Sequence, residues 1–430
     1  MKIQPKTSFK YRLLFKYSQT FIPHLFYKVE VNGLEHIDAT QPAIFLPCHQ
    51  NGLLDCLTLL SVVHLPIAFY AKSAFFKGKL MNKILAFLRI MPVYRGKENL
   101  QDVVRNEENF QNGINLLLKN YPLCIMPEGG QHSEHRLHNL AKGAFRIAFQ
   151  AQQQLPQNQS VYLYPVGLDY GEYEKIGYPF ILNVGKPIKV LDFMPLYNEN
   201  PPKGINAIKD ALYQALASQI LNIRSTEYYQ TIYVSSYLGS AKTKKRKLNA
   251  LLTSAFKHRQ LIENQLNTLQ TQSEDTLKNL SQSVEQYLQH KPDFVLSSLP
   301  LSRLSVASVV AFVVLFLPLF IYGLVLNLPT LLIYRFLLHP KLKGGTMVAT
   351  VKSVIYLMLS PVIHLIAACV LAFCLHSWWI GLAVFFTGMI VTAFTAKYFS
   401  RLRLIKAKIF TPKNASEKEI YTQIEKMETH

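Results

Sequence analysis

Three long apolar stretches near the C-terminus constrain this chain more than any other feature of its sequence. Segments 353–375 and 378–396 are each long enough for one membrane crossing, which takes roughly 20 residues. Segment 304–334 also lacks charged residues, but Pro318 and Pro329 interrupt it. At roughly 30 residues it is too long for one straight crossing and too short for two. We therefore predict an integral membrane protein with one broken or re-entrant segment and two transmembrane helices.

Basic residues flank the two predicted transmembrane helices and predict their orientation. Lys and Arg collect on the cytoplasmic side of membrane proteins, so both flanks and the tail 397–430 are expected in the cytoplasm. The turn between the helices contains Trp378 and Trp379, which suit a membrane interface. The flanking residues are Arg335, Lys341, Lys343 and Lys352 before the pair, and Lys397, Arg401, Arg403, Lys406 and Lys408 after it.

The formal net charge of +20 indicates an anionic partner. Membrane lipids are the predicted partner, because the basic stretch 241–259 accompanies the later membrane segments. Nucleic-acid binding is not predicted, since no nucleic-acid-binding module accompanies that stretch. The stretch belongs to a basic connector, 226–300, with two expected helices that carry one apolar stripe each. These helices are expected to pack on the part of the chain that precedes them or on a second subunit, and the sequence does not choose between the two.

Residues 1–28 combine aromatic and cationic side chains. This pattern predicts an amphipathic helix on the membrane surface, or one packed against the following domain, and both arrangements are compatible. The helix carries Phe9, Tyr11, Leu13, Leu14, Phe15, Tyr17 and Phe21 among Lys10, Arg12 and Lys16.

Residues 29–225 alternate between short apolar runs and amphipathic stretches. Such alternation predicts an α/β fold in which helices flank a mainly parallel sheet. The run 43–46 predicts a buried strand that Pro47 closes, and the leucines from Leu53 to Leu60 recur at helical spacing. A membrane region, 301–396, follows this domain and the connector.

His49 is predicted on the turn after that strand, and Asp55 in the first turn of the helix. Open α/β sheets place their sites beyond the carboxyl ends of strands. A carboxylate there orients an imidazole whose other nitrogen takes a proton from a hydroxyl. A structural or solvent-facing pair is the alternative for these two residues in isolation. Cys48 is an unfavourable nucleophile, because neighbours on an extended strand point to opposite faces.

Further polar residues follow two later strands. Arg95 and Lys97 follow one strand, and Glu128 with Gly129 and Gly130 follows another, where glycines let the backbone approach a ligand closely. The loop and helix beyond carry Arg136 and Lys142. In isolation, Arg95 also fits an ordinary cation at a strand end, and Glu128 a helix cap. His132, His135 and His138 are spaced by three, but without an HExxH-like pattern no metal site is predicted.

Together these segments resemble the glycerolipid acyltransferase superfamily, which includes glycerol-3-phosphate and lysophosphatidic acid acyltransferases. The resemblance covers residues 20–220 and has two departures. Five residues separate the His and Asp instead of the usual four, and Gln131 stands where the family has an arginine. The matching segments are His49 with Asp55, Arg95 in MPVYRGKE, Pro127-Glu128-Gly129, and Tyr164-Pro165-Val166.

The resemblance implies acyl transfer from acyl-CoA or acyl carrier protein to the hydroxyl of glycerol-3-phosphate or lysophosphatidate, in phospholipid synthesis. It implies His49 as general base, Asp55 as its orienting partner, and Arg95 and Glu128 as residues that place the acceptor. A phosphate cradle would draw on Lys97, Gly129, Gly130, Arg136 and Lys142. No cofactor and no metal are expected, because the thioester is already activated.

The expected location is a bacterial inner membrane, with the catalytic domain facing the cytoplasm. Two alternatives stay open. Gln131 in place of arginine favours an acyltransferase for another lipid or for an amine acceptor. A non-catalytic lipid-binding scaffold that keeps the fold is the second alternative.

Overall fold

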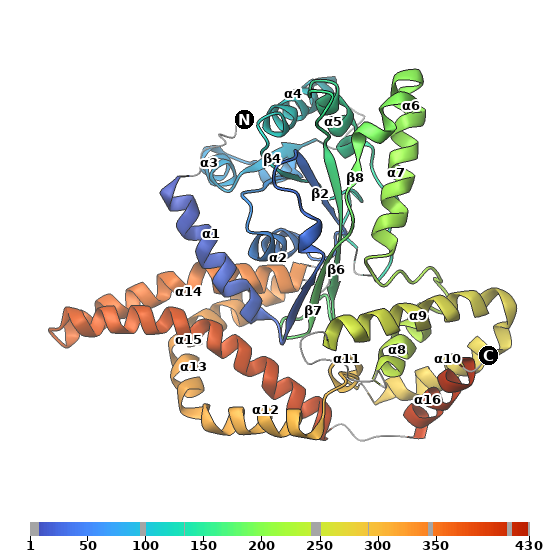
Figure 1. Ribbon diagram of the computed structural model, residues 1–430. Helices are drawn as coiled ribbons and strands as arrows, with labels where there is room; N and C mark the ends of the chain where they lie inside the picture. The colour runs from blue at the N-terminus through green and yellow to red at the C-terminus, as the bar shows by residue number, and fades with distance from the viewer. Residues whose placement is uncertain are drawn as a thin grey trace.

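The computed structural model describes residues 8–94, 100–132, 134–241, 251–290, 292–342, 347–410 and 415–428. It contains an α/β domain, a helical region beside it, and a long helical hairpin that projects from the body (Figure 1). Arg95 and Lys97 lie outside the described residues.

The α/β domain is built on a mixed, mostly parallel sheet with the strand order β1-β7-β6-β2-β5-β3-β4. Strands β7 and β8 pair antiparallel with β6, while the other pairs are parallel. The predicted fold class is therefore confirmed. The strands are β1 Val29–Asn32, β2 Ala43–Pro47, β3 Ala68–Lys72, β4 Ile90–Val93, β5 Leu123–Cys124, β6 Tyr162–Tyr170, β7 Phe180–Val184 and β8 Ile188–Lys189.

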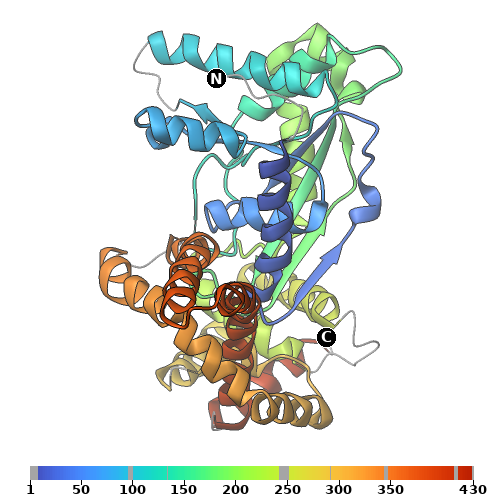
Figure 2. The same ribbon diagram turned by 90° about the vertical axis from the view of Figure 1, so that its left-hand side faces the viewer.

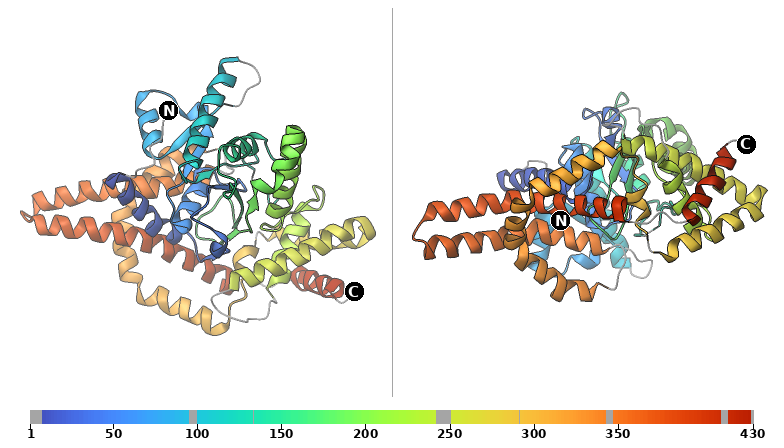
Figure 3. Two further views of the ribbon diagram at one scale, coloured as in Figure 1. Left: turned by 45° about the horizontal axis from the view of Figure 1, so that its top comes forward. Right: turned by 90° about the horizontal axis from the view of Figure 1, so that it is seen from below.

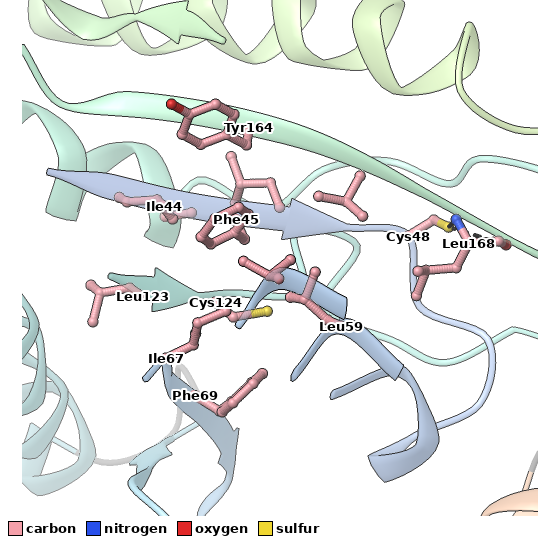
Figure 4. Packing of buried hydrophobic residues seen from close by; sticks show 14 of the residues in the cluster. Ile44, Phe45, Cys48, Leu59, Ile67, Phe69, Leu123, Cys124, Tyr164 and Leu168 are labelled. Atoms are coloured by element: carbon pink, nitrogen blue, oxygen red, sulfur yellow. Dashed lines mark hydrogen bonds between the residues drawn. The ribbon is translucent and has the colours of Figure 1, made fainter. Parts of the chain in front are cut away.

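Strand β2 lies in the middle of the sheet and forms the centre of the core. All five of its residues are buried, as the continuous apolar run predicted for a strand covered on both faces. Figure 4 shows Phe45 beside Tyr164 of β6, and their ring centroids are 5.2 Å apart. The helices of this domain are α1 Phe9–Phe21, α2 Leu53–Val63, α3 Lys79–Phe87, α4 Leu100–Leu117, α5 Gly143–Gln152, α6 Met194–Glu199 and α7 Pro201–Ala217.

A second hydrophobic core holds the helical region together. It joins α8–α11 to the C-terminal helix α16, which contributes Ile420 and Ile424. A buried ion pair between Arg259 of α9 and Asp169 of β6 ties this region to the sheet. The helices are α8 Tyr229–Ser240, α9 Leu251–Gln272, α10 Glu274–Gln289, α11 Phe294–Ser297 and α16 Ala415–Glu428.

The membrane region contains α12 Arg303–Leu315, α13 Leu317–Leu332, α14 Met347–Cys374 and α15 Trp378–Ile405. In the described part of the chain, three stretches are long and apolar enough to cross a bilayer, namely Leu317–Lys341, Met347–Cys374 and Trp378–Ile409. Helices α14 and α15 form the projecting hairpin, which Figure 2 shows nearly end-on and Figure 3 from two further sides. The three helices indicate membrane association.

Helix α13 runs at a steep angle to the hairpin and contacts both of its helices near their middle (Figure 1). Thr392 of α15 donates a hydrogen bond of 2.8 Å to Asn327 of α13, and Ser360 of α14 donates one of 3.4 Å to Thr330 of α13. Hydroxyl and amide groups of this kind hold helices together where apolar surface gives no driving force. The apolar run predicted as one interrupted segment is thus divided at Phe316 into α12 and α13.

Candidate active site

The turn between β2 and α2 brings His49 and Asp55 into contact. Nδ1 of His49 lies 2.9 Å from Oδ2 of Asp55. Gly52 makes the sharp turn possible, because its φ of +56° is a conformation that residues with a side chain rarely adopt. The six-residue separation in sequence therefore becomes a hydrogen bond in the structure, as the strand, turn and helix pattern predicted.

The carboxylate of Asp55 is fully buried and accepts four hydrogen bonds. Burying a carboxylate is costly unless it is hydrogen-bonded, and this shell of donors supplies the hydrogen bonds. The position of Asp55 in the first turn of α2 also suits a negative charge. Its donors are Nδ1 of His49 at 2.9 Å, the amides of Gln50 at 3.0 Å and Asn51 at 2.9 Å, and Oη of Tyr170 at 2.8 Å.

The carboxylate fixes the tautomer of the imidazole. Oδ2 of Asp55 is an acceptor, so Nδ1 of His49 carries the hydrogen and Nε2 has its lone pair available. The side chain of His49 is 17% exposed. The geometry can therefore present a basic nitrogen to a hydroxyl that approaches from outside.

Tyr170 is a residue of this site that the sequence reasoning missed. It lies at the end of β6, and its fully buried hydroxyl also lies 3.2 Å from that of Thr58. The available signal was alternation along β6, because Tyr164 and Tyr170 are an even number of positions apart and share a face of the sheet. Nothing in the sequence indicated that this face meets Asp55.

Glu128 connects the catalytic turn to the loop that follows β5. Oε1 accepts the amide hydrogen of His49 at 2.9 Å, and Oε2 accepts that of His138 at 3.0 Å. Burial raises the pKa of this carboxyl group, and the two amides act in the opposite direction. Gln131 adds a bond of 3.2 Å from its amide nitrogen to the carbonyl of Gln50. These contacts give Glu128 and Gln131 a structural part in holding the turn.

Gly129 and Gly130 form the tight turn after Glu128. The φ of Gly129 is +63°, and its amide donates to the carbonyl of Met126 at 3.2 Å. A Cβ on Gly130 would lie 3.0 Å from Nε2 of His132. The glycines therefore allow a left-handed turn and a close histidine ring, which accounts for them without a ligand.

Two of the predicted cations, Arg136 and Lys142, belong to the described residues. The guanidinium of Arg136 donates to the carbonyls of Ile223 and Ser225 and to the hydroxyl of Thr226, at 2.8–3.1 Å. Lys142 is exposed at the N-cap of α5. Within the described residues, neither side chain forms a hydrogen bond with the turn between β2 and α2. Their part in a phosphate cradle stays a prediction, as does that of Arg95 and Lys97.

The three spaced histidines have separate environments. The rings of His132 and His138 stack with centroids 3.6 Å apart, while His135 is buried against Oη of Tyr173 at 2.8 Å. Burial, with help from Arg259, lowers the pKa of His135 to about 3. Among the described residues, no group of three or more His, Cys, Asp or Glu side chains is placed to hold a metal ion.

Cys48 is fully buried between the catalytic turn and β6. Its Sγ accepts the amide hydrogen of Leu168 at 3.1 Å, a contact that is visible in Figure 4. Burial raises the pKa of this thiol well above its ordinary value. A thiol held in the neutral form is a weak nucleophile, so the environment of Cys48 is that of a structural cysteine.

Comparisons with known proteins show which family and which proteins the chain is similar to. The model of the acyltransferase family matches residues 28–169, which include strands β1 to β5, all of β6 except Tyr170, and the His49–Asp55 pair. The chain is similar to the chloroplast 1-acyl-sn-glycerol-3-phosphate acyltransferase LPAT1 of Arabidopsis thaliana, with 28% identity over 29% of this chain and 33% of the relative. The chloroplast 1-acyl-sn-glycerol-3-phosphate acyltransferase BAT2 of Brassica napus is 26% identical over 40% of this chain and 46% of the relative.

These matches are partial. The chain spans between a third and a half of the length of these two curated relatives. Among solved structures, it is similar to the 1-acyl-sn-glycerophosphate acyltransferase PlsC of Thermotoga maritima, with a TM-score of 0.36 and 18% identity. That likeness covers 48% of this chain and 78% of the other.

Proposed function

Since the model of the acyltransferase family matches residues 28–169, we propose that the protein is a membrane-bound O-acyltransferase of phospholipid synthesis. It transfers a fatty acyl group from an acyl-CoA or acyl carrier protein thioester to the hydroxyl of glycerol-3-phosphate or lysophosphatidate. The observation that carries the proposal is the His49–Asp55 pair, in which a buried, fully hydrogen-bonded carboxylate orients an imidazole beyond the central strand.

The proposed step is a direct transfer without a covalent enzyme intermediate. Nε2 of His49 removes the proton of the acceptor hydroxyl while the oxygen of that hydroxyl attacks the carbonyl carbon of the thioester. The carbon–sulfur bond then breaks, and the imidazolium returns the proton to the leaving thiolate. Asp55 stabilises the imidazolium in between, through its bond to Nδ1. A positioned general base of this kind contributes roughly 10²–10⁴-fold in rate.

A phosphorylated acceptor is the first choice because both curated relatives are named for 1-acyl-sn-glycerol-3-phosphate. Position 131 offers no cation for the phosphate, because it is occupied by Gln131, whose amide bonds to the turn. The phosphate must therefore be bound by other cations. Arg95, Lys97 and Lys142 are the proposed candidates. The same Gln131 favours the second candidate function, acyl transfer to an uncharged lipid or to an amine.

We further propose that the α14–α15 hairpin crosses the membrane and that α13 stays on one side of it. The two ends of the membrane region lie together, since Nζ of Lys408 donates to the carbonyls of Ser297 and Leu299. Helix α16, beyond the hairpin, packs in one core with α8 and α10, before it. An even number of crossings is required for this arrangement, and α14 and α15 supply two. The basic flanks of the hairpin favour the cytoplasm as the shared side.

The test is acyl transfer by purified protein in lipid nanodiscs, with labelled acyl-CoA and acyl carrier protein donors. The acceptors are glycerol-3-phosphate, lysophosphatidate and an uncharged monoacylglycerol, and His49→Ala is compared with His290→Ala, an exposed histidine in the helical region. We expect transfer to a phosphorylated acceptor that falls at least 100-fold in His49→Ala and is unchanged in His290→Ala. Transfer only to monoacylglycerol would support the second candidate. No transfer from either donor, or full activity of a folded His49→Ala variant, would contradict catalysis by this pair.

A further inference from the structure

The first turns of the membrane helix α14 pack directly on the catalytic turn. The hydroxyl of Thr350 donates to the carbonyl of Asn51 and accepts the amide hydrogen of Leu54 at 3.3 Å. The sulfur of Met347 lies 3.5 Å from the position that a Cβ on Gly52 would occupy. Thr350 is only 3% exposed. A segment about 300 residues away in the sequence thus covers the turn between His49 and Asp55.

This contact acts on Asn51, whose amide holds the carboxylate of Asp55. The amide of Asn51 donates to Oδ2 of Asp55, and its carbonyl accepts the hydroxyl of Thr350. The next residue, Gly52, has φ +56° and ψ −122°, which is neither helical nor extended backbone. Within the turn, the amide of Leu54 donates to the carbonyl of Asn51 at 3.0 Å, and an irregular turn of this kind also depends on outside partners for its conformation. Thr350 supplies two of those partners with one hydroxyl group.

The packing around Thr350 is a part of the core of the catalytic domain. Ala349, Tyr356 and Leu357 of α14 belong to the same buried cluster as strand β2. The base of the hairpin is also anchored from α15, because Nζ of Lys397 donates to the carbonyl of Phe26 at 3.3 Å. The hairpin therefore enters the domain at a fixed place, beside the catalytic turn.

We propose that the α14–α15 hairpin completes the active site, with Thr350 as the positioning residue for the His49–Asp55 pair. This inference rests on the proposed acyltransferase function and adds a dependence that the family match does not contain, since that match ends at residue 169. Transfer then requires the hairpin to be docked on the domain. The docked hairpin also holds His49 near the membrane surface. Thr350 lies only about 3 Å along the helix axis from Lys352, the basic residue directly before the predicted membrane segment 353–375.

The test compares Thr350→Val, which keeps the shape and removes the hydroxyl, with Thr350→Ser, which restores it. Ser353→Ala is the matched control, because Ser353 is also buried in α14 but donates only to the carbonyl of Ala349 in its own helix. We expect kcat to fall by roughly tenfold or more in Thr350→Val, because the carbonyl of Asn51 and the amide of Leu54 then keep only their bond to each other and lose the hydroxyl that holds them against α14. The KM for the donor should change less than twofold, and Thr350→Ser should recover most of kcat.

Two further readouts separate positioning from a general loss of stability. The acid limb of the pH–rate profile should move in Thr350→Val, since the imidazole is then less well held by Asp55, and it should not move in Ser353→Ala. Hydrogen exchange of the peptide that covers residues 49–54 should become faster in Thr350→Val and in Thr350→Ala. This second measurement stands even where a variant has too little activity for kinetics.

The outcomes distinguish this inference from the proposed function. Wild-type protein without transfer activity would refute the proposed function, and exchange at residues 49–54 would still test the contact. Active wild-type protein with an unchanged kcat and an unchanged pH profile in folded Thr350→Val would overturn the positioning role. An equal loss in Ser353→Ala would also overturn it, because the effect would then belong to the helix in general.

Discussion

Replacement of Tyr170 by phenylalanine removes one donor from the catalytic carboxylate. The hydroxyl of Tyr170 lies 2.8 Å from Oδ1 of Asp55, and the three other donors of that carboxylate all bond to Oδ2. Phenylalanine keeps the packing of the ring, so Oδ1 is left buried without a donor. A hydrogen bond to a charged group is worth about 1.5–3 kcal/mol, and the penalty for a buried unpaired group is of similar size.

We therefore expect Tyr170→Phe to lower the free energy of unfolding by about 2 kcal/mol. The rate should also fall, because the carboxylate is less firmly held against Nδ1 of His49. A loss of about 1.4 kcal/mol in the transition state corresponds to about tenfold in kcat. The three bonds to Oδ2 remain, so the effect should be much smaller than that of His49→Ala.

Thermal unfolding in detergent and acyl transfer in nanodiscs measure the two effects. Tyr164→Phe is the matched control, because this buried tyrosine on the same strand accepts the amide hydrogen of Asp38 at 2.8 Å, at a place without contact to Asp55. It should lower stability by about 1 kcal/mol and leave kcat unchanged. Equal kcat values for Tyr170→Phe and the wild type, with equal stability, would refute the assigned hydrogen bond.

Two further predictions concern buried groups in other places. Burial raises the pKa of Glu263 in α9 to about 7, so its contribution to stability is present below its ordinary pKa near 4.5 and is lost as the pH rises through 7. Glu263→Gln should therefore raise the free energy of unfolding at pH 8 by up to about 3 kcal/mol, seen as a higher unfolding temperature, and should change it little near pH 4.5. The same gain at both pH values would contradict the raised pKa. Cys48→Ala should keep kcat within about threefold, since burial holds the thiol neutral, and loss of transfer in the folded variant would assign Cys48 a chemical role.

The parts of this protein that the sequence predicted are those that local periodicity encodes. Apolar runs at strand and helix spacing indicated an α/β domain, because the two periods of 2.0 and 3.6 residues are properties of the backbone itself. The uncharged stretches near the C-terminus indicated membrane helices by length alone. His49 and Asp55 were predicted as a pair because six residues of strand, turn and helix leave few arrangements. Their contact of 2.9 Å is a local event.

The predicted phosphate-binding residues show where this reasoning ends. Arg136 follows Glu128 closely in sequence, but its guanidinium bonds to residues 223–226, which enter from the far end of the domain. Glu128 was predicted to place the acceptor, and this stays a prediction; what the sequence did not indicate is that its two oxygens accept backbone amides on either side of the site. The direction of a side chain at the end of a strand depends on which distant segment supplies a partner, and no local pattern records that partner.

The sequence by itself therefore determined the classes of structure and the chemistry of the catalytic pair, since both depend on residues that are close along the chain. Only the tertiary structure decided what surrounds that pair. Tyr170 reaches Asp55 across 115 positions, and Thr350 reaches Asn51 across 299. Contacts over such separations arise from the packing of complete elements, here β6 beside β2 and α14 against α2. The catalytic turn is local in sequence, but it is held in place by a strand and a membrane helix that only folding brings to it.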